Sequence, residues 1–116
     1  MSKVKGDAAE RQAEEFLKSR GFAIVERNFR TRMGEIDLVA KDGETAVFVE
    51  VRSRSSSAFG SPEETVTAPK RRRLILTAQA WAQSRAWEGP MRFDVVAITP
   101  AETLHIPDAF DAAGAW

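Results

Sequence analysis

The chain has 116 residues, of which 43% are hydrophobic, which suits one compact core, so we expect a single domain over residues 1–116. It contains no cysteine and one histidine, which excludes disulfides, thiolate metal sites, cysteine nucleophiles and histidine-rich metal sites. The 17 basic and 17 acidic side chains cancel, so the whole molecule is not an obvious binder of polyanions.

The charges are nevertheless unevenly distributed along the chain. From Phe93 onward there are four acids and no lysine or arginine, so the preceding residues carry four more basic than acidic side chains. The amino terminus opens directly into charged residues, without an apolar stretch long enough for a signal peptide or a membrane span. We therefore expect a cytoplasmic protein that does not enter a membrane.

The first predicted element is an amphipathic helix over residues 5–20, with Gly21 as its C-terminal stop. One helical stripe carries the apolar residues Ala9, Ala13, Phe16 and Leu17. Glu10 falls at the border of this stripe, whereas Glu14 falls one turn later and further out. Glu10 is therefore the better placed of the two acids to reach a site beside a sheet.

After a first strand over residues 22–29, the sequence predicts a β-hairpin. Two runs of alternating character, residues 35–40 and 45–52, flank the pair Asp42-Gly43, which is a strong signal for a tight turn. The resulting register pairs Lys41 with Glu44, Ala40 with Thr45, Ile36 with Val49 and Glu35 with Glu50.

The two faces of this hairpin differ in character. One face is apolar and suited to a core: Ile36, Leu38, Ala40, Val47, Val49 and Val51. The other carries Glu35, Asp37, Phe48, Glu50 and Arg52. On it Asp37 and Glu50 are diagonal neighbours whose carboxylates can converge on a divalent cation. Glu35 opposite Glu50 needs a positive neighbour, either Arg52 or a metal ion; the alternative is a simple ion pair between Glu35 and Arg52.

The second half of the chain predicts a helix and two more strands. Ser61-Pro62-Glu63-Glu64 is a capping box, and a helix over residues 67–87 should bury Leu74, Ala78 and Trp81. A strand over residues 91–99 is apolar enough to be buried on both faces, and residues 104–106 suit a short edge strand. This order predicts a three-layer α/β fold, a mixed sheet flanked by helices.

Basic residues gather around the predicted hairpin. Lys70, Arg71, Arg72 and Arg73 fall in the first turn of their helix, where cations oppose the helix dipole, so a phosphate partner would resolve the conflict. Arg30, Arg32 and Arg54 lie just before and after the hairpin. Acids that hold a metal within a basic rim are typical of a nuclease. The alternative is a solvated basic face.

The hairpin resembles the catalytic hairpin of the restriction-endonuclease-like, PD-(D/E)XK superfamily of nucleases. More closely, the whole chain resembles the YraN family of bacterial proteins. The motifs that carry this resemblance are residues 6–10, Arg27-Asn28-Phe29-Arg30, Gly34-Glu35-Ile36-Asp37-Leu38, Phe48-Val49-Glu50-Val51, Phe59-Gly60, Lys70, Arg92-Phe93-Asp94-Val95-Val96 and residues 106–110. They cover nearly the whole chain.

The resemblance implies a restriction-endonuclease-like fold and a catalytic site that binds Mg²⁺ or Mn²⁺. Asp37 and Glu50 match the superfamily's metal carboxylates, and Glu10 matches the helical glutamate of resolvase-like relatives. Arg52 stands where the superfamily usually has lysine; arginine is always charged and cannot act as a base. By analogy with junction-cutting enzymes of similar fold, the resemblance also implies branched DNA as a substrate and a homodimer as the acting form.

Three functions remain open at this point. The first is a metal-dependent endonuclease with catalytic Asp37, Glu50 and Arg52, metal ligands Asp37, Glu50 and Glu10, and a DNA-binding rim. The rim comprises Arg30, Arg32, Arg54, Lys70, Arg71 and Arg72. The second is a nucleic-acid-binding module that has lost catalysis with the lysine. The third is a scaffold whose acidic patch docks a basic protein.

Overall fold

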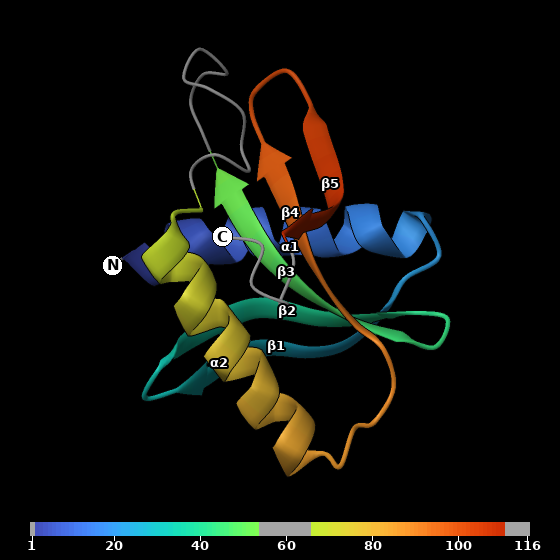
Figure 1. The fold of residues 1–116 in the computed structure, drawn as a ribbon. Helices are drawn as coiled ribbons and strands as arrows, with labels where there is room; N and C mark the ends of the chain where they lie inside the picture. Colours follow the sequence, from blue (N-terminus) through green and yellow to red (C-terminus); the bar gives the residue numbers. More distant parts are fainter. Residues whose placement is uncertain (1, 54–65, 111–116) are drawn as a thin grey trace.

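The computed structural model describes residues 2–53 and 66–110, with side chains from residue 8 onward. In chain order the elements are α1 (Ser2–Ser19), β1 (Ala23–Thr31), β2 (Gly34–Asp42), β3 (Thr45–Ser53), α2 (Ala68–Ser84), β4 (Met91–Ile98) and β5 (Thr103–Phe110). The strands form one sheet in the order β1-β2-β3-β4-β5, in which only the β3–β4 pair is parallel (Figure 1). α2 lies in the connection that this parallel pair requires.

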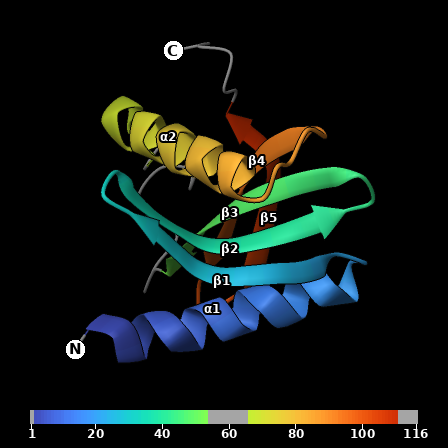
Figure 2. The same cartoon turned by 90° about the horizontal axis from the view of Figure 1, so that it is seen from below.

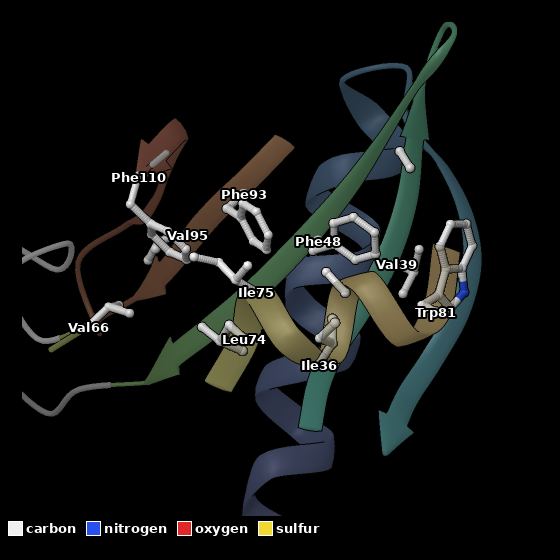
Figure 3. Packing of buried hydrophobic residues seen from close by; sticks show 12 residues of the cluster. Ile36, Val39, Phe48, Val66, Leu74, Ile75, Trp81, Phe93, Val95 and Phe110 are labelled. Atoms are coloured by element: carbon white, nitrogen blue, oxygen red, sulfur yellow. The ribbon is translucent and has the colours of Figure 1, made fainter. Parts of the chain in front are cut away.

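The predicted three-layer α/β fold is confirmed. The two helices cover opposite faces of the sheet, α1 below and α2 above in Figure 2. Between α1 and the sheet lies a buried cluster of Ala9, Ala13, Leu17, Phe22, Leu38, Ala40, Val47, Val49, Val96 and Ile98. Beneath α2 lies a second cluster, which includes Ile36, Val39, Phe48, Leu74, Ala78, Trp81, Phe93 and Val95 (Figure 3). Val95 and Val96 belong to different clusters, so β4 is buried on both faces as predicted.

Several element boundaries differ from the predictions. α1 begins at Ser2, and β1 continues to Thr31. α2 ends at Ser84, before Ala86, whose φ of 54° lies in the left-handed region and cannot continue a helix. β5 extends to Phe110, because the Phe110 ring stacks on Phe93 with centroids 4.9 Å apart. The predicted capping box at 61–64 lies outside the described residues.

The predicted hairpin register is wrong by two residues. Asp42 pairs with Thr45 and Leu38 with Val49, so the turn residues are Gly43 and Glu44. Gly43 has φ 61°, and a glycine at the first central position is the choice of a type II′ turn. Because the shift is an even number of residues, each side chain keeps its predicted face of β3.

A polar cluster joins β4 to β5 at the end of the sheet order. Asp94 is fully buried, and its carboxylate accepts hydrogen bonds from Arg92 Nε and Nη2 at 2.9 and 3.0 Å and from the Asp108 N–H at 3.0 Å. His105 Nε2 lies 2.7 Å from the same carboxylate, and its ring packs edge-on against Phe22. This cluster is a satisfied buried carboxylate with a structural role.

Within residues 2–53 and 66–110, none of the helices is both long enough and apolar enough to span a membrane.

Candidate functional site

The candidate site lies on the β2–β3 hairpin, where Asp37 and Glu50 come from neighbouring strands. The observed ladder ends at the pair of Leu38 with Val49, and Asp37 and Glu50 are the next residues of the two strands. The two acids are close enough for the negative charge of Glu50 to act on Asp37. At this step the Asp37 carboxylate itself accepts a hydrogen bond from the Val51 N–H, at 2.8 Å. The Asp37 side chain thus links β2 to β3 next to Glu50.

Asp37 is held in surroundings that disfavour its charge. Burial, followed by the negative charge of Glu50, raises the pKa of Asp37 from 3.8 to about 8, with smaller contributions from Glu10 and Glu35. The hydrogen bond from Val51 acts in the opposite direction and does not compensate. A carboxylate with a pKa raised by burial and by neighbouring acids is a candidate for a functional site.

Glu50 is buried, with 7% of its surface exposed, and it has two cationic neighbours. Lys70 Nζ, from the first turn of α2, lies 3.0 Å from Glu50 Oε2. Arg52 Nε, two residues along β3, lies 3.4 Å from the same oxygen. The predicted opposition of Glu35 to Glu50 is wrong: Glu35 pairs with Arg30 of β1, whose Nη2 is 3.1 Å from its Oε2.

Both strands of the β1–β2 pair change faces beside Asp37. Arg27 pairs with Leu38, and these residues face α1, whereas the next cross-strand pair, Phe29 with Ile36, packs beneath α2. In a regular ladder both pairs would share a face. The prediction that Ile36 shares a face with Leu38 was therefore wrong, and Phe48, which was predicted on the face that carries the acids, is buried.

The cause of this switch is the backbone at Asn28, which lies between the two cross-strand pairs and across from Asp37. Its φ of 51° is left-handed, a conformation in which asparagine is enriched among non-glycine residues. Its side-chain Nδ2 donates a hydrogen bond to Glu10 Oε1 at 2.9 Å. Asn28 therefore both bends β1 at the site and fixes Glu10 on α1, roles that we did not predict. An asparagine within a predicted strand was the available signal.

The outcomes for the two helical acids differ from the prediction. Glu10 is half-buried and turned toward Asn28, in a pocket of about 240 Å³ between α1 and β1 whose lining includes neither Asp37 nor Glu50. Glu14 was predicted to lie further out and is instead 6% exposed. It is buried because the Arg27 guanidinium binds it, with Nε 2.8 Å from Oε1, and this bond lowers the pKa of Glu14.

The donor set suits a hard divalent cation. Mg²⁺ is typically held by one or two carboxylates, with water and phosphate oxygens completing its shell, and Asp37 and Glu50 provide such a pair. Among the residues with described side chains, no three acids, histidines or cysteines form a group that could hold an ion by themselves. Glu10 is therefore not gathered with the other two acids, and the pair Asp37 and Glu50 is the donor set that the fold offers.

The predicted nucleic-acid-binding residues divide into three groups. Arg30, Arg32 and Arg72 are exposed. The β1–β2 turn, which carries Arg32, lies beside α2 in both Figure 1 and Figure 2. Gly34, at the end of this turn, is so close to α2 that a Cβ atom there would contact Thr77 and Arg73. Lys70 and Arg71 point inward: Lys70 contacts Glu50, while Arg71 Nε donates to the Val66 carbonyl at 2.7 Å. Arg54 lies outside the described residues.

Comparison with known proteins assigns a family to this arrangement. The family model described as "Uncharacterised protein family UPF0102" matches residues 9–98. The chain belongs to the UPF0102 family. The matched segment contains α1 from Ala9 onward, the hairpin, α2 and β4, and with them every described residue of the candidate site. The predicted resemblance to YraN-type proteins is thereby confirmed.

Relatives in the family match almost end to end. A UPF0102 protein of Persephonella marina is 45% identical over 109 residues, covering 93% of this chain and 94% of the relative. A UPF0102 protein of Anaeromyxobacter sp. is 52% identical, with 97% and 88% covered. One from Hahella chejuensis is 50% identical, with 90% and 88% covered. The chain therefore corresponds to most of the length of each of these relatives.

Proposed function

We propose that this protein hydrolyses phosphodiester bonds in DNA with the help of Mg²⁺ or Mn²⁺. The observation that carries the proposal is that Asp37 and Glu50 lie on adjacent strands, close enough for the charge of Glu50 to raise the pKa of Asp37. Two carboxylates placed in this way can bind a hard divalent cation such as Mg²⁺. A bound ion of this type lowers the pKa of a water molecule and stabilises negative charge on a phosphate.

The chain's own residues have separate tasks in this proposal. Asp37 and Glu50 would hold the ion, with Val51 fixing the orientation of Asp37 through its backbone N–H. Arg52 would act as a permanent positive charge beside Glu50, stabilising charge that develops on the phosphate. Glu10, turned toward Asn28, would contribute to the negative field at Asp37 from α1.

Nucleic acid is the polyanion that best fits the surrounding charges. Arg30 and Arg32 at the end of β1 and Arg72 on α2 are exposed, so they would contact the phosphate backbone on either side of a scissile bond. The acids that balance them in the overall count include four in the segment from Phe93 onward, which has no lysine or arginine. A zero net charge therefore does not weigh against DNA binding.

A second function is favoured by one residue, Arg52. An arginine cannot take up or release a proton at neutral pH, so the site would bind phosphate without activating water through this position. The protein would then be a nucleic-acid-binding module of the same fold. It would bind DNA in a salt-sensitive way and leave every bond intact.

The experiment that separates these functions measures nicking of supercoiled plasmid and of a four-way DNA junction in Mn²⁺ or Mg²⁺. We expect cleavage by the wild-type protein and a loss of about 100-fold or more in Asp37→Asn and Glu50→Gln, which keep the shape of each side chain but remove its charge. Glu44→Gln, in the exposed hairpin turn, should stay within about twofold of wild type. Cleavage that persists in both site variants would exclude this site as its source.

A further inference from the structure

Lys70 is the one lysine among the described residues that the fold brings into contact with Glu50. It lies three residues after Thr67, the N-cap of α2, and its Nζ is 3.0 Å from Glu50 Oε2. The contact joins the first turn of α2 to β3, the strand that precedes α2 in the chain. With 35% of its side chain exposed, Lys70 is reachable from solvent and is not sealed in the core.

We infer that Lys70 supplies, from α2, the lysine ammonium that β3 lacks at position 52, and that it contacts the scissile phosphate beside Glu50. This inference rests on the proposed function and names a residue for it. A lysine ammonium is a compact charge with three donors, so it can keep one hydrogen bond to Glu50 and direct another to a phosphate oxygen. Arg52 and Lys70 would then approach one carboxylate from two different elements.

The neighbouring cations cannot take this role. Arg71 is committed to the Val66 carbonyl and packs over the Phe110 ring, with its guanidinium carbon 5.7 Å from the ring centroid. Arg72, two residues from Lys70 on the helix, is exposed and points to a different side of α2. The position of Lys70 is therefore distinct from the rest of the basic run.

A purely structural alternative would make Lys70 only the counter-ion that allows Glu50 to be buried. The two alternatives predict opposite changes in Mn²⁺ affinity when Lys70 is replaced. A positive charge beside Glu50 repels a cation bound there, so its removal should tighten Mn²⁺ binding while it slows cleavage. If Lys70 merely held Glu50 in place, its removal would loosen the carboxylate and weaken Mn²⁺ binding.

The test measures Mn²⁺ dissociation constants by calorimetry without DNA, and single-turnover cleavage at saturating DNA and Mn²⁺. In Lys70→Ala and Lys70→Gln we expect Mn²⁺ to bind about three- to tenfold more tightly, the lower end reflecting solvent screening at a partly exposed lysine. Cleavage should fall about 100-fold. Lys70→Gln keeps the length and a hydrogen-bond donor, so it isolates the charge.

Arg72→Ala is the matched control, because it removes one positive charge from the same helix turn without touching Glu50. Its Mn²⁺ affinity should stay within twofold of wild type while its DNA affinity falls. The inference is overturned if the Lys70 variants bind Mn²⁺ no more tightly than Arg72→Ala, or if they cleave as fast as the wild-type protein. A wild-type protein that neither binds Mn²⁺ nor cleaves would instead overturn the proposed function, and with it this role for Lys70.

Discussion

At the scale of single residues, Asp37 both accepts a hydrogen bond that links two strands and lies where its negative charge is disfavoured. Its carboxylate replaces a backbone acceptor for Val51, so it must lie inside the ladder, and there it meets the charge of Glu50. The result is an acid whose pKa of about 8 lies far above that of a free side chain. Such a group destabilises the fold whenever it is forced to ionise without a cation beside it.

We expect Asp37→Asn to stabilise the metal-free protein in alkaline solution. The folded pKa of Asp37 is raised above its unfolded value of 3.8, so the folded state binds more protons and stability falls as pH rises from about 4 to about 8. Asparagine keeps an acceptor for Val51 and has no charge to bury. The variant should exceed wild type by at least about 1 kcal/mol at pH 8, and by less at pH 5, in urea unfolding.

The control for this prediction is Asp42→Asn on the same strand, where the acid is exposed and its removal should change stability equally little at both pH values. Addition of Mn²⁺ at pH 8 should raise the stability of wild type and leave Asp37→Asn nearly unchanged, because only the acid can bind the ion. Equal pH profiles for wild type and Asp37→Asn would contradict the raised pKa.

The two acids of the site could be predicted from sequence, whereas their neighbours could not. Alternation along a strand has a period of two, so a register error of two residues still placed Asp37 and Glu50 together. The contact of Lys70 with Glu50 depends on how α2 docks against β3, which no local pattern encodes. The face switch at Asn28 depends on a single left-handed residue, which strand periodicity treats as regular.

At the scale of elements, β4 and β5 are joined by buried polar groups as well as by apolar packing. The prediction limited β5 to residues 104–106, whereas the strand runs from Thr103 to Phe110. In the fold, Asp108 adopts φ 54° and its N–H bonds to Asp94. The buried Asp94 carboxylate on β4 thus accepts the backbone hydrogen bond of Asp108, where the regular pairing of β5 with β4 is interrupted.

We therefore expect Asp94→Ala to destabilise the protein by about 3 kcal/mol, because it leaves the Arg92 guanidinium and His105 without their common acceptor in a buried setting. Thermal or urea unfolding measures this loss. Asp42→Ala removes the other, exposed carboxylate near Arg92, 3.4 Å from Nη1, and should cost less than about 1 kcal/mol. Similar losses for the two variants would contradict the structural role of Asp94.

At the scale of the whole molecule, charge separates along the chain while the total remains zero. The start of α2 and the β1–β2 turn lie on the same side of the molecule in Figures 1 and 2, and Lys70 of α2 contacts Glu50. At the C-terminal end of α1, Arg20 packs over Phe16 with its guanidinium carbon 4.4 Å from the ring centroid. If nucleic acid is the partner, we expect the exposed Arg32 to contact it and Arg20 to lie outside the contact.

Binding of duplex DNA should weaken steeply as salt rises, with Arg32→Ala reducing the slope of log K against log salt by about 1, the share of one phosphate contact. Fluorescence anisotropy over a KCl series measures both quantities. Arg20→Ala, which removes an exposed arginine at the far end of α1, should leave the slope as it is. Equal slopes for Arg32→Ala and wild type would place the DNA elsewhere.

The topology also imposes an order on folding. Asp37 and Glu50 belong to one local hairpin, a unit that forms within microseconds, whereas Lys70 reaches Glu50 only after α2 has docked and β3 has joined β4 in parallel. The nascent hairpin must therefore bring its two acids together before their cation is in place. The repulsion between Asp37 and Glu50 therefore weakens the isolated hairpin until α2 supplies Lys70.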